Sequence, residues 1–301
     1  MPKYRHLTTT AQLSREWIES ELFPLSDALR DDKTRDLVLA GRSLYCLFYE
    51  PSFLTRTSFE RAIGLLGGDA HHTEDASQFF PVRTPSYMDN IIHILASLHI
   101  DLVVLRSSDP GVVERAEMAD ALPVINGGNL DDHPTQALAD LYTLRRELGS
   151  IDGKRIGIVG RLEHRNVSAL LKGLALFESV SATLVPFSGH VDPEVVAHCE
   201  ERGMSLDVGG SVDGLGEVDA IYLNGPRTVA HAQLLRSRGS FTLRIDREFM
   251  DGLRPHCVIL DPMQRSGDFS VDVEDERLAF YRQSENALFV RMALLHNMLA
   301  E

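Results

Sequence analysis

Short apolar runs that alternate with amphipathic segments constrain the fold of this chain more than any other feature. The runs that predict strands lie at 43–49, 102–106, 122–126, 155–160, 182–187, 220–224 and 257–261. Segments with helical periodicity lie at 10–29, 56–66, 85–98, 110–119, 134–148, 166–178, 193–203 and 284–300. Strands that are apolar at nearly every position indicate parallel sheets with both faces covered by helices.

The strand–helix pattern runs twice, which predicts two domains. A long amphipathic segment, PTQALADLYTLRRELG, closes the first half, and RIGIVG begins a new sheet after the turn SIDGK. A chain of 301 residues is too long for one ordinary core and sufficient for two. We therefore expect an α/β protein of two doubly wound parallel-sheet domains, with a boundary near residue 150. Ligands of such folds gather at the carboxyl ends of the strands.

Composition argues against several classes of function. The formal net charge of −14 disfavours a general nucleic-acid or anionic-membrane binder. The three cysteines form no C-x-x-C pair, which disfavours a disulfide framework or zinc site and fits a reducing compartment such as the cytoplasm. We expect Cys46 and Cys257 to be buried and inert. The chain contains no run of about 18 apolar residues, so we expect no membrane span. The segment MPKYRHLTTT lacks the apolar region of a signal peptide.

A dinucleotide site is not favoured at RIGIVGR, because Gly157 and Gly160 are followed by RLEHRN rather than by the rest of a G-x-G-x-x-G fingerprint. The stretch EPSFLTRTSFE, residues 50–60, is more informative. Hydroxyl side chains just before a helix can hold an anion together with the backbone N–H groups of its first turn. The alternative for this stretch alone is a plain capped helix.

Polar residues follow three further strands. Arg106 ends LVVLR, and Asp132-His133-Pro134-Thr135-Gln136 follows LPVIN and its loop. Pro134 suits the first helical turn, so His133 and Gln136 are expected to face the same cleft. Asp261-Pro262-Met263-Gln264-Arg265 follows the last strand.

Together these stretches resemble the aspartate/ornithine carbamoyltransferase family, in order and over nearly the whole chain. HPTQALADLY is close to the carbamoyl-phosphate motif of that family, and EPSFLTRTSFE resembles its E-P-S-T-R-T-R-x-S-F-E. DPMQR resembles its H-P-L-P-R, and QSENALFVRMALL resembles its closing helix. The resemblance implies a carbamoyl-phosphate domain at 1–149 with a returning helix at 284–301, and an acceptor domain at 150–283.

The resemblance also implies roles for individual residues. Ser52 and Thr55 would hold phosphate oxygens with the N–H groups of residues 53–55. Arg106, His133 and Thr55 would face the carbamoyl oxygen. Gln136 would hold the NH2 group of the carbamoyl group.

An amine then attacks the carbonyl carbon and phosphate leaves, with no metal or organic cofactor. The implied partners are small anionic substrates and two further copies in a homotrimer with shared sites, acting in pyrimidine biosynthesis. The cation that a neighbouring subunit usually supplies corresponds to Arg83.

The phosphate motif departs from the family at Phe53 and Leu54, because Leu54 stands where the family has an Arg. Losing one charge-assisted hydrogen bond costs about 1.5–3 kcal/mol. Three interpretations stay open. Arg56 or Arg83 supplies the missing charge; the donor is something other than carbamoyl phosphate; or the protein is a catalytically weak relative with a regulatory or binding role.

The acceptor half predicts an amine that carries a carboxylate, aspartate-like rather than ornithine-like. Arg165 and Arg227 fall near positions where aspartate-type members hold carboxylates, and bidentate pairing explains that placement. The alternative for both is a solvated loop Arg. Pro262, Met263 and Arg265 complete the predicted acceptor site.

Overall fold

This computed structural model describes residues 4–31, 37–73, 75–78, 85–225, 243–262 and 270–300. The chain divides into two compact units, Met1–Ala139 with Glu285–Glu301, and Asp140–Ser284. The expected α/β architecture with two parallel sheets is confirmed, and the C-terminal helix packs with the first unit. The division falls inside two helices, so the sequence-based boundary at residues 149 and 150 stays a prediction.

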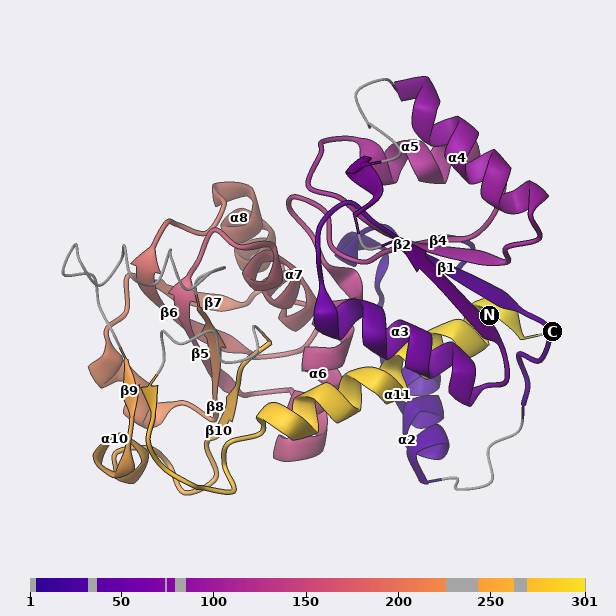
Figure 1. Ribbon diagram of the computed structural model, residues 1–301. Coiled ribbons are helices and arrows are strands. Elements are labelled where there is room, and N and C mark those ends of the chain that lie inside the picture. Colours follow the sequence, from indigo (N-terminus) through magenta and orange to yellow (C-terminus); the bar gives the residue numbers. More distant parts are fainter. Residues whose placement is uncertain are drawn as a thin grey trace. The chain divides into compact units, whose positions relative to one another are not determined.

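The first unit is built on a parallel sheet of order β2-β1-β3-β4 (Figure 1). Its strands are β1 (Ser43–Phe48), β2 (Asp69–Thr73), β3 (Leu102–Arg106) and β4 (Val124–Asn126). Its helices are α1 (Arg15–Trp17), α2 (Phe23–Asp31), α3 (Phe53–Leu65), α4 (Pro85–Ser97) and α5 (Val112–Ala119), with parts of α6 (Pro134–Leu148) and α11 (Phe280–Leu299).

Both faces of this sheet are buried, as the apolar runs predict. Leu47, Val103 and Leu105 point into a cluster with α4 and α5. Their neighbours Leu44 and Val104 point to the opposite face and are equally buried, and Figure 1 shows α3 and α11 on that side. Successive side chains of a strand alternate between faces, so a strand covered on both faces must be apolar throughout.

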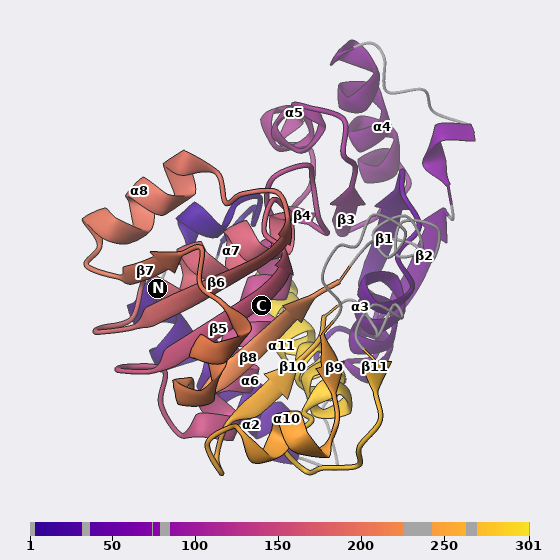
Figure 2. The same cartoon turned by 90° about the vertical axis from the view of Figure 1, so that its left-hand side faces the viewer.

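The second unit holds a parallel sheet of order β10-β8-β5-β6-β7 (Figure 2). Its strands are β5 (Arg155–Arg161), β6 (Ser181–Ser188), β7 (Ser205–Val208), β8 (Ala220–Asn224) and β10 (Val258–Leu260), and β9 (Arg244–Ile245) pairs with β11 (Ser270–Val271). Its helices are α7 (Arg165–Leu174), α8 (Pro193–Glu201) and α10 (Arg247–Asp251).

Several predicted helices have different bounds in the structure, and two of them have a clear physical reason. The segment 10–29 is not one helix: Ser14 begins a new helix by accepting from the Trp17 amide at 3.3 Å, after a 3-10 turn at Thr10–Gln12. Hydroxyl side chains compete with the helical backbone in this way. The helix expected at 56–66 starts earlier, at Phe53, because Ser52 adopts the extended conformation of an N-cap residue.

The edge strands β2 and β7 were absent from the sequence prediction. Both are mostly exposed, and each pairs with only one neighbour. The sequence of β2, DAHHT, has no apolar periodicity, and the alternation of polar and apolar residues in β7, SLDV, covers only four residues and is a weak signal.

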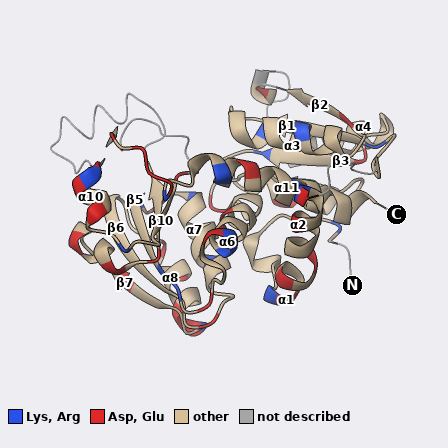
Figure 3. Ribbon diagram, turned by 90° about the horizontal axis from the view of Figure 1, so that it is seen from below, with Lys and Arg blue, Asp and Glu red and all other residues tan. Residues whose placement is uncertain are grey.

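Cys46 and Cys257 are buried free thiols, as expected, and Cys199 is also buried. Burial raises the pKa of Cys199 to about 11 and that of Cys257 to about 12. Within the described residues, no helix is both long and apolar enough to cross a membrane. Acidic and basic residues are scattered over the helices, strands and loops of each unit (Figure 3).

A fully buried arginine joins α11 to α3 within the first unit. Arg291 donates from Nη1 to the Ser58 hydroxyl, and its guanidinium carbon lies 5.2 Å from the centroid of the Phe59 ring. The Ser58 hydroxyl also faces the carbonyl oxygens of Leu54 and Thr55. This chain of contacts links the C-terminal helix to the first turn of α3.

We predict that Arg291→Ala lowers the free energy of unfolding by about 2–5 kcal/mol, because it empties a filled core position and removes the partner of Ser58. Arg282→Ala on the same helix is the control. Arg282 pairs with Glu147 at a partly exposed position, so its loss should cost about 1 kcal/mol or less. Urea denaturation measures both, and equal losses would contradict the structural role given to Arg291.

Candidate active site

The carboxyl ends of β1, β3 and β4 meet at one edge of the first sheet. Phe48 pairs with Arg106, and Leu105 pairs with Asn126. The Tyr49 amide donates to the Arg106 carbonyl oxygen at 2.8 Å, which extends the pairing to the start of the next loop. The segments after β1 and β4 therefore leave the sheet on either side of Arg106.

The segment after β1 turns at once into α3. Ser52 is the N-cap residue, and its side chain makes no capping hydrogen bond among the described residues. The first intrahelical bond of this turn runs from the Arg56 amide to the Ser52 carbonyl oxygen, so the amides of residues 53–55 lie in the open turn of the helix. Thr55 is buried in that turn, and the amides and the helix dipole favour an anion there.

Arg106 supplies a cation at the same edge. It is almost fully buried, donates from Nη1 to the Gly127 carbonyl oxygen at 2.9 Å, and its Nε lies 4.0 Å from Glu50 Oε2. A buried guanidinium needs such partners to offset the loss of its hydration. The contact with Gly127 also fixes the backbone at the start of the loop toward α6.

This loop brings His133 and Gln136 to the first turn of α6. His133 is 3% exposed and Gln136 is 5% exposed. The His133 carbonyl oxygen accepts from the Gln136 amide at 3.0 Å, and Thr135 Oγ1 lies 3.4 Å from His133 Nδ1. Pro134 occupies the first helical position, where its missing N–H costs nothing.

The residues that depart from the family motif differ in their exposure. The Phe53 side chain is 70% exposed, whereas Leu54 is half-buried. Arg56 points toward Glu60, with Nε 3.8 Å from Oε1, and the same oxygen lies 2.8 Å from His72 Nδ1 on β2. Arg56 therefore faces a carboxylate on its own helix, which weakens its positive potential at the open turn.

The second unit holds part of the predicted acceptor site. Arg165 begins α7 after β5 and is 5% exposed, so it is not the solvated loop residue of the alternative interpretation. Asp261 and Pro262 follow β10, and the Asp261 amide donates to Gln283 Oε1 at 2.9 Å. Arg83, Arg227, Met263, Gln264 and Arg265 lie outside the described residues.

Sequence reasoning missed several residues of this region. The sequence predicts no separate role for Glu50, yet its carboxylate lies beside Arg106. It predicts no role for Asp132 either, yet this residue is buried and accepts hydrogen bonds from the N-terminal segment. The position of Asp132 directly before His133 is the one sequence signal that could have indicated its importance.

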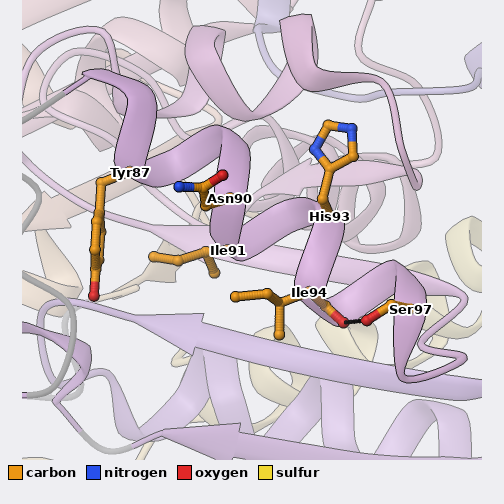
Figure 4. A pocket seen from close by; sticks show the side chains of 6 residues that line it. All are labelled: Tyr87, Asn90, Ile91, His93, Ile94 and Ser97. Carbon is orange, nitrogen blue, oxygen red and sulfur yellow. Dashed lines mark hydrogen bonds between the residues drawn. The ribbon is translucent and has the colours of Figure 1, made fainter.

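A shallow pocket on the outer side of α4 is separate from these residues (Figure 4). Tyr87, Ile91 and Ile94 line it together with polar side chains, and His93 Nδ1 donates to the Asp89 carbonyl oxygen of its own helix. None of the candidate residues named above lines it. Over the described part of the chain, no group of three His, Cys, Asp or Glu residues could hold a metal ion.

Comparison with known proteins shows to which family this chain belongs. Residues 5–146 match the family described as aspartate/ornithine carbamoyltransferase, carbamoyl-P binding domain. Over 274 residues the chain is 32% identical to the chloroplastic aspartate carbamoyltransferase of Oryza sativa subsp. japonica, with 88% of this chain and 75% of the rice protein covered. The chain belongs to the aspartate/ornithine carbamoyltransferase family.

Two further relatives agree with this assignment. The aspartate carbamoyltransferase catalytic subunit of Methanocaldococcus jannaschii is 32% identical over 272 residues, covering 88% of this chain and 87% of that protein. Aspartate transcarbamoylase from Trypanosoma cruzi in complex with carbamoyl phosphate and aspartate superposes with a TM-score of 0.85 at 26% identity, covering 99% of this chain and 98% of that one. The protein is a carbamoyltransferase-family enzyme.

We predict that Arg106→Met weakens binding of carbamoyl phosphate at least about tenfold, because one charged hydrogen-bond donor is lost from a buried position. Arg42→Met is the matched control, since Arg42 pairs with Asp101 at the opposite end of β1. Calorimetric titration measures both. A change of the same size in the two variants would mean that Arg106 does not contact the anion.

Proposed function

We propose that this enzyme transfers the carbamoyl group of carbamoyl phosphate to the amino group of a small carboxylated acceptor such as aspartate. The observation that carries the proposal is the open first turn of α3 beside the buried Arg106, in a chain that belongs to this family. The open turn and Arg106 both attract an anion and lie at one edge of the sheet. They therefore suit a donor molecule that carries a phosphate group at one end.

The chemistry needs donors aimed at the oxygen that becomes negative. In the proposed arrangement Ser52, Thr55 and the amides of α3 hold the phosphate. Arg106 and His133 face the carbamoyl oxygen, and Gln136 accepts from the carbamoyl NH2 group. The acceptor amine attacks the carbonyl carbon, the tetrahedral oxyanion is stabilised by these preorganised donors, and phosphate leaves.

The acceptor assignment draws on the second unit. Arg165 is a buried cation at the N-terminus of α7, where the helix dipole adds to its positive potential. A guanidinium in such a place suits bidentate pairing with a carboxylate. The aspartate bound in the Trypanosoma cruzi relative supports the same class of acceptor. Arg227, Pro262, Met263 and Arg265 remain proposed acceptor residues.

The remaining parts of the proposal follow from the family resemblance. They are a homotrimer in which Arg83 reaches the site of a neighbouring subunit, a role in pyrimidine biosynthesis, and a cytoplasmic location. The predicted absence of a metal or organic cofactor belongs with them, because phosphate is a good leaving group when its charge is held by fixed donors.

A different donor, or a binding role without turnover, is the second candidate. Leu54 and the pairing of Arg56 with Glu60 favour it, because both reduce the positive charge at the open turn of α3. Under this candidate Phe53 and Leu54 form part of a pocket for a less charged molecule.

We predict that the purified protein binds carbamoyl phosphate in the micromolar range and more tightly than inorganic phosphate. Calorimetry tests this without knowledge of the acceptor. An absence of binding at millimolar donor would overturn the proposal and favour the second candidate.

The variant Leu54→Arg sharpens the same measurement. If other groups already hold the phosphate, the added guanidinium should change donor affinity by no more than a few-fold, or lower it where Leu54 packs in a working pocket. A gain of about tenfold or more, the size of one charged hydrogen bond, would instead mean that the wild-type site lacks a necessary cation.

We also predict that His133→Ala lowers turnover by about 10²-fold or more, because a donor to the developing oxyanion is removed, and that this effect is far larger than the loss of thermal stability. His93→Ala on α4 is the control and should leave turnover unchanged. Steady-state kinetics and thermal unfolding measure the two effects. Parallel loss of turnover and stability would argue that His133 has only a structural role.

A further inference from the structure

The carboxylate of Asp132 lies directly before His133 and is surrounded by hydrogen-bond donors. Its Oδ1 accepts from the His133 amide at 2.8 Å and from the Thr10 hydroxyl. Its Oδ2 accepts from the Thr10 amide and from the Thr9 hydroxyl, each at 2.9 Å. The residue is 4% exposed, so these protein groups take the place of water around its charge.

The donors belong to a segment that is itself fixed to the sheet. The Leu7 amide donates to the Val124 carbonyl oxygen at 2.9 Å, and the Asn126 amide donates to the Leu7 carbonyl oxygen at 2.8 Å. Asn126 Nδ2 donates to the Thr8 carbonyl oxygen at 2.9 Å. Residues 7–10 thus run beside the end of β4 and present Thr9 and Thr10 to the loop that carries His133.

The contacts require a carboxylate rather than an amide. Each oxygen of Asp132 accepts from one backbone N–H, of His133 on one side and of Thr10 on the other. A hydroxyl can rotate to accept from an NH2 group, but a backbone N–H cannot. In either orientation, therefore, the NH2 group of an asparagine at this position would face a backbone N–H.

We infer that Asp132, held by Thr9 and Thr10, is a positioning residue for His133. The inference rests on the proposed function, in which His133 faces the carbamoyl oxygen. Asp132 fixes the His133 backbone from one side, and the start of α6 fixes it from the other. The His133 backbone is therefore fixed on both sides, which orients the imidazole as preorganised catalysis requires.

The decisive variants are Asp132→Asn, which opposes an NH2 group to a backbone N–H, and Thr10→Val, which removes one hydroxyl and keeps the side-chain shape. Thr10→Ser restores the hydroxyl. Thr8→Val is the matched control, because the buried Thr8 hydroxyl donates to Glu117 Oε2 at 2.7 Å and makes no contact with Asp132. The control reports what loss of a threonine hydroxyl in this segment does by itself.

We predict that kcat falls about tenfold in Thr10→Val and about a hundredfold in Asp132→Asn, the size expected when a catalytic group is displaced by a fraction of an ångström to one ångström. Thr10→Ser should recover most of the kcat, and Thr8→Val should keep the wild-type value. The KM for aspartate should stay within about twofold throughout. A kcat in Thr10→Val and Asp132→Asn equal to that of Thr8→Val would overturn the inference.

A second readout does not depend on turnover. The Cε1–H resonance of the His133 ring, assigned by its loss in His133→Ala, should move in Thr10→Val and Asp132→Asn and stay in place in Thr8→Val. If the wild-type protein shows no carbamoyl transfer but the His133 resonance still moves in Thr10→Val and Asp132→Asn, the proposed function is refuted and the positioning is upheld. An unmoved resonance would refute the positioning whatever the turnover.

Discussion

The parallel register of β1, β3 and β4 is the constraint on which the candidate site depends. Because these strands all run the same way, their carboxyl ends lie at one edge, and each must leave the sheet there through a loop with polar groups to satisfy. Arg106 ends the central strand of this group, and the loops on either side provide Ser52 and His133. The register of the strands thus brings residues more than 80 positions apart in sequence to one edge of the sheet.

The sequence was sufficient to predict the parts of the fold that are periodic and buried. The apolar runs at 43–49, 102–106 and 155–160 correspond to strands covered on both faces, for which a continuous apolar run is necessary. The edge strands β2 and β7 were harder to predict, because β2 has no apolar pattern and the alternation in β7 is only four residues long. The helix α3 begins at Phe53, three residues before the predicted start at residue 56, because the amphipathic pattern does not mark the first helical turn.

The sequence predicted where the candidate residues lie in the fold, but it did not predict which groups they contact. Arg106, His133 and Gln136 follow strands, and position along the chain was enough to select them. Their partners come from distant segments: Gly127 for Arg106, and the Thr9–Thr10 pair for the loop before His133. A hydrogen bond across more than 100 residues leaves no local pattern, so only the structure reveals that Asp132 is buried.

Charge at the open turn of α3 is more balanced than the number of arginines suggests. Arg106 lies near Glu50, and Arg56 faces Glu60. Each carboxylate lowers the positive potential of its neighbour, so the backbone amides and the hydroxyls of Ser52 and Thr55 contribute a larger share of any attraction for an anion. A leucine at position 54 is compatible with a site of this kind, because neutral donors remain where the family has a further cation.

Both ends of the chain stabilise this region from opposite sides of the first unit. The N-terminal segment holds the loop before His133 through Asp132, and the C-terminal helix holds α3 through Arg291 and Ser58. Each contact buries a charge, and an apolar side chain of similar volume would give comparable packing without the cost of desolvation. The difference lies in direction: a hydrogen-bonded carboxylate or guanidinium fixes the orientation of the backbone it contacts. These two charges contact the segments that, in the proposed function, hold the phosphate and the carbamoyl oxygen, and there the accuracy of orientation matters more than the free energy of burial.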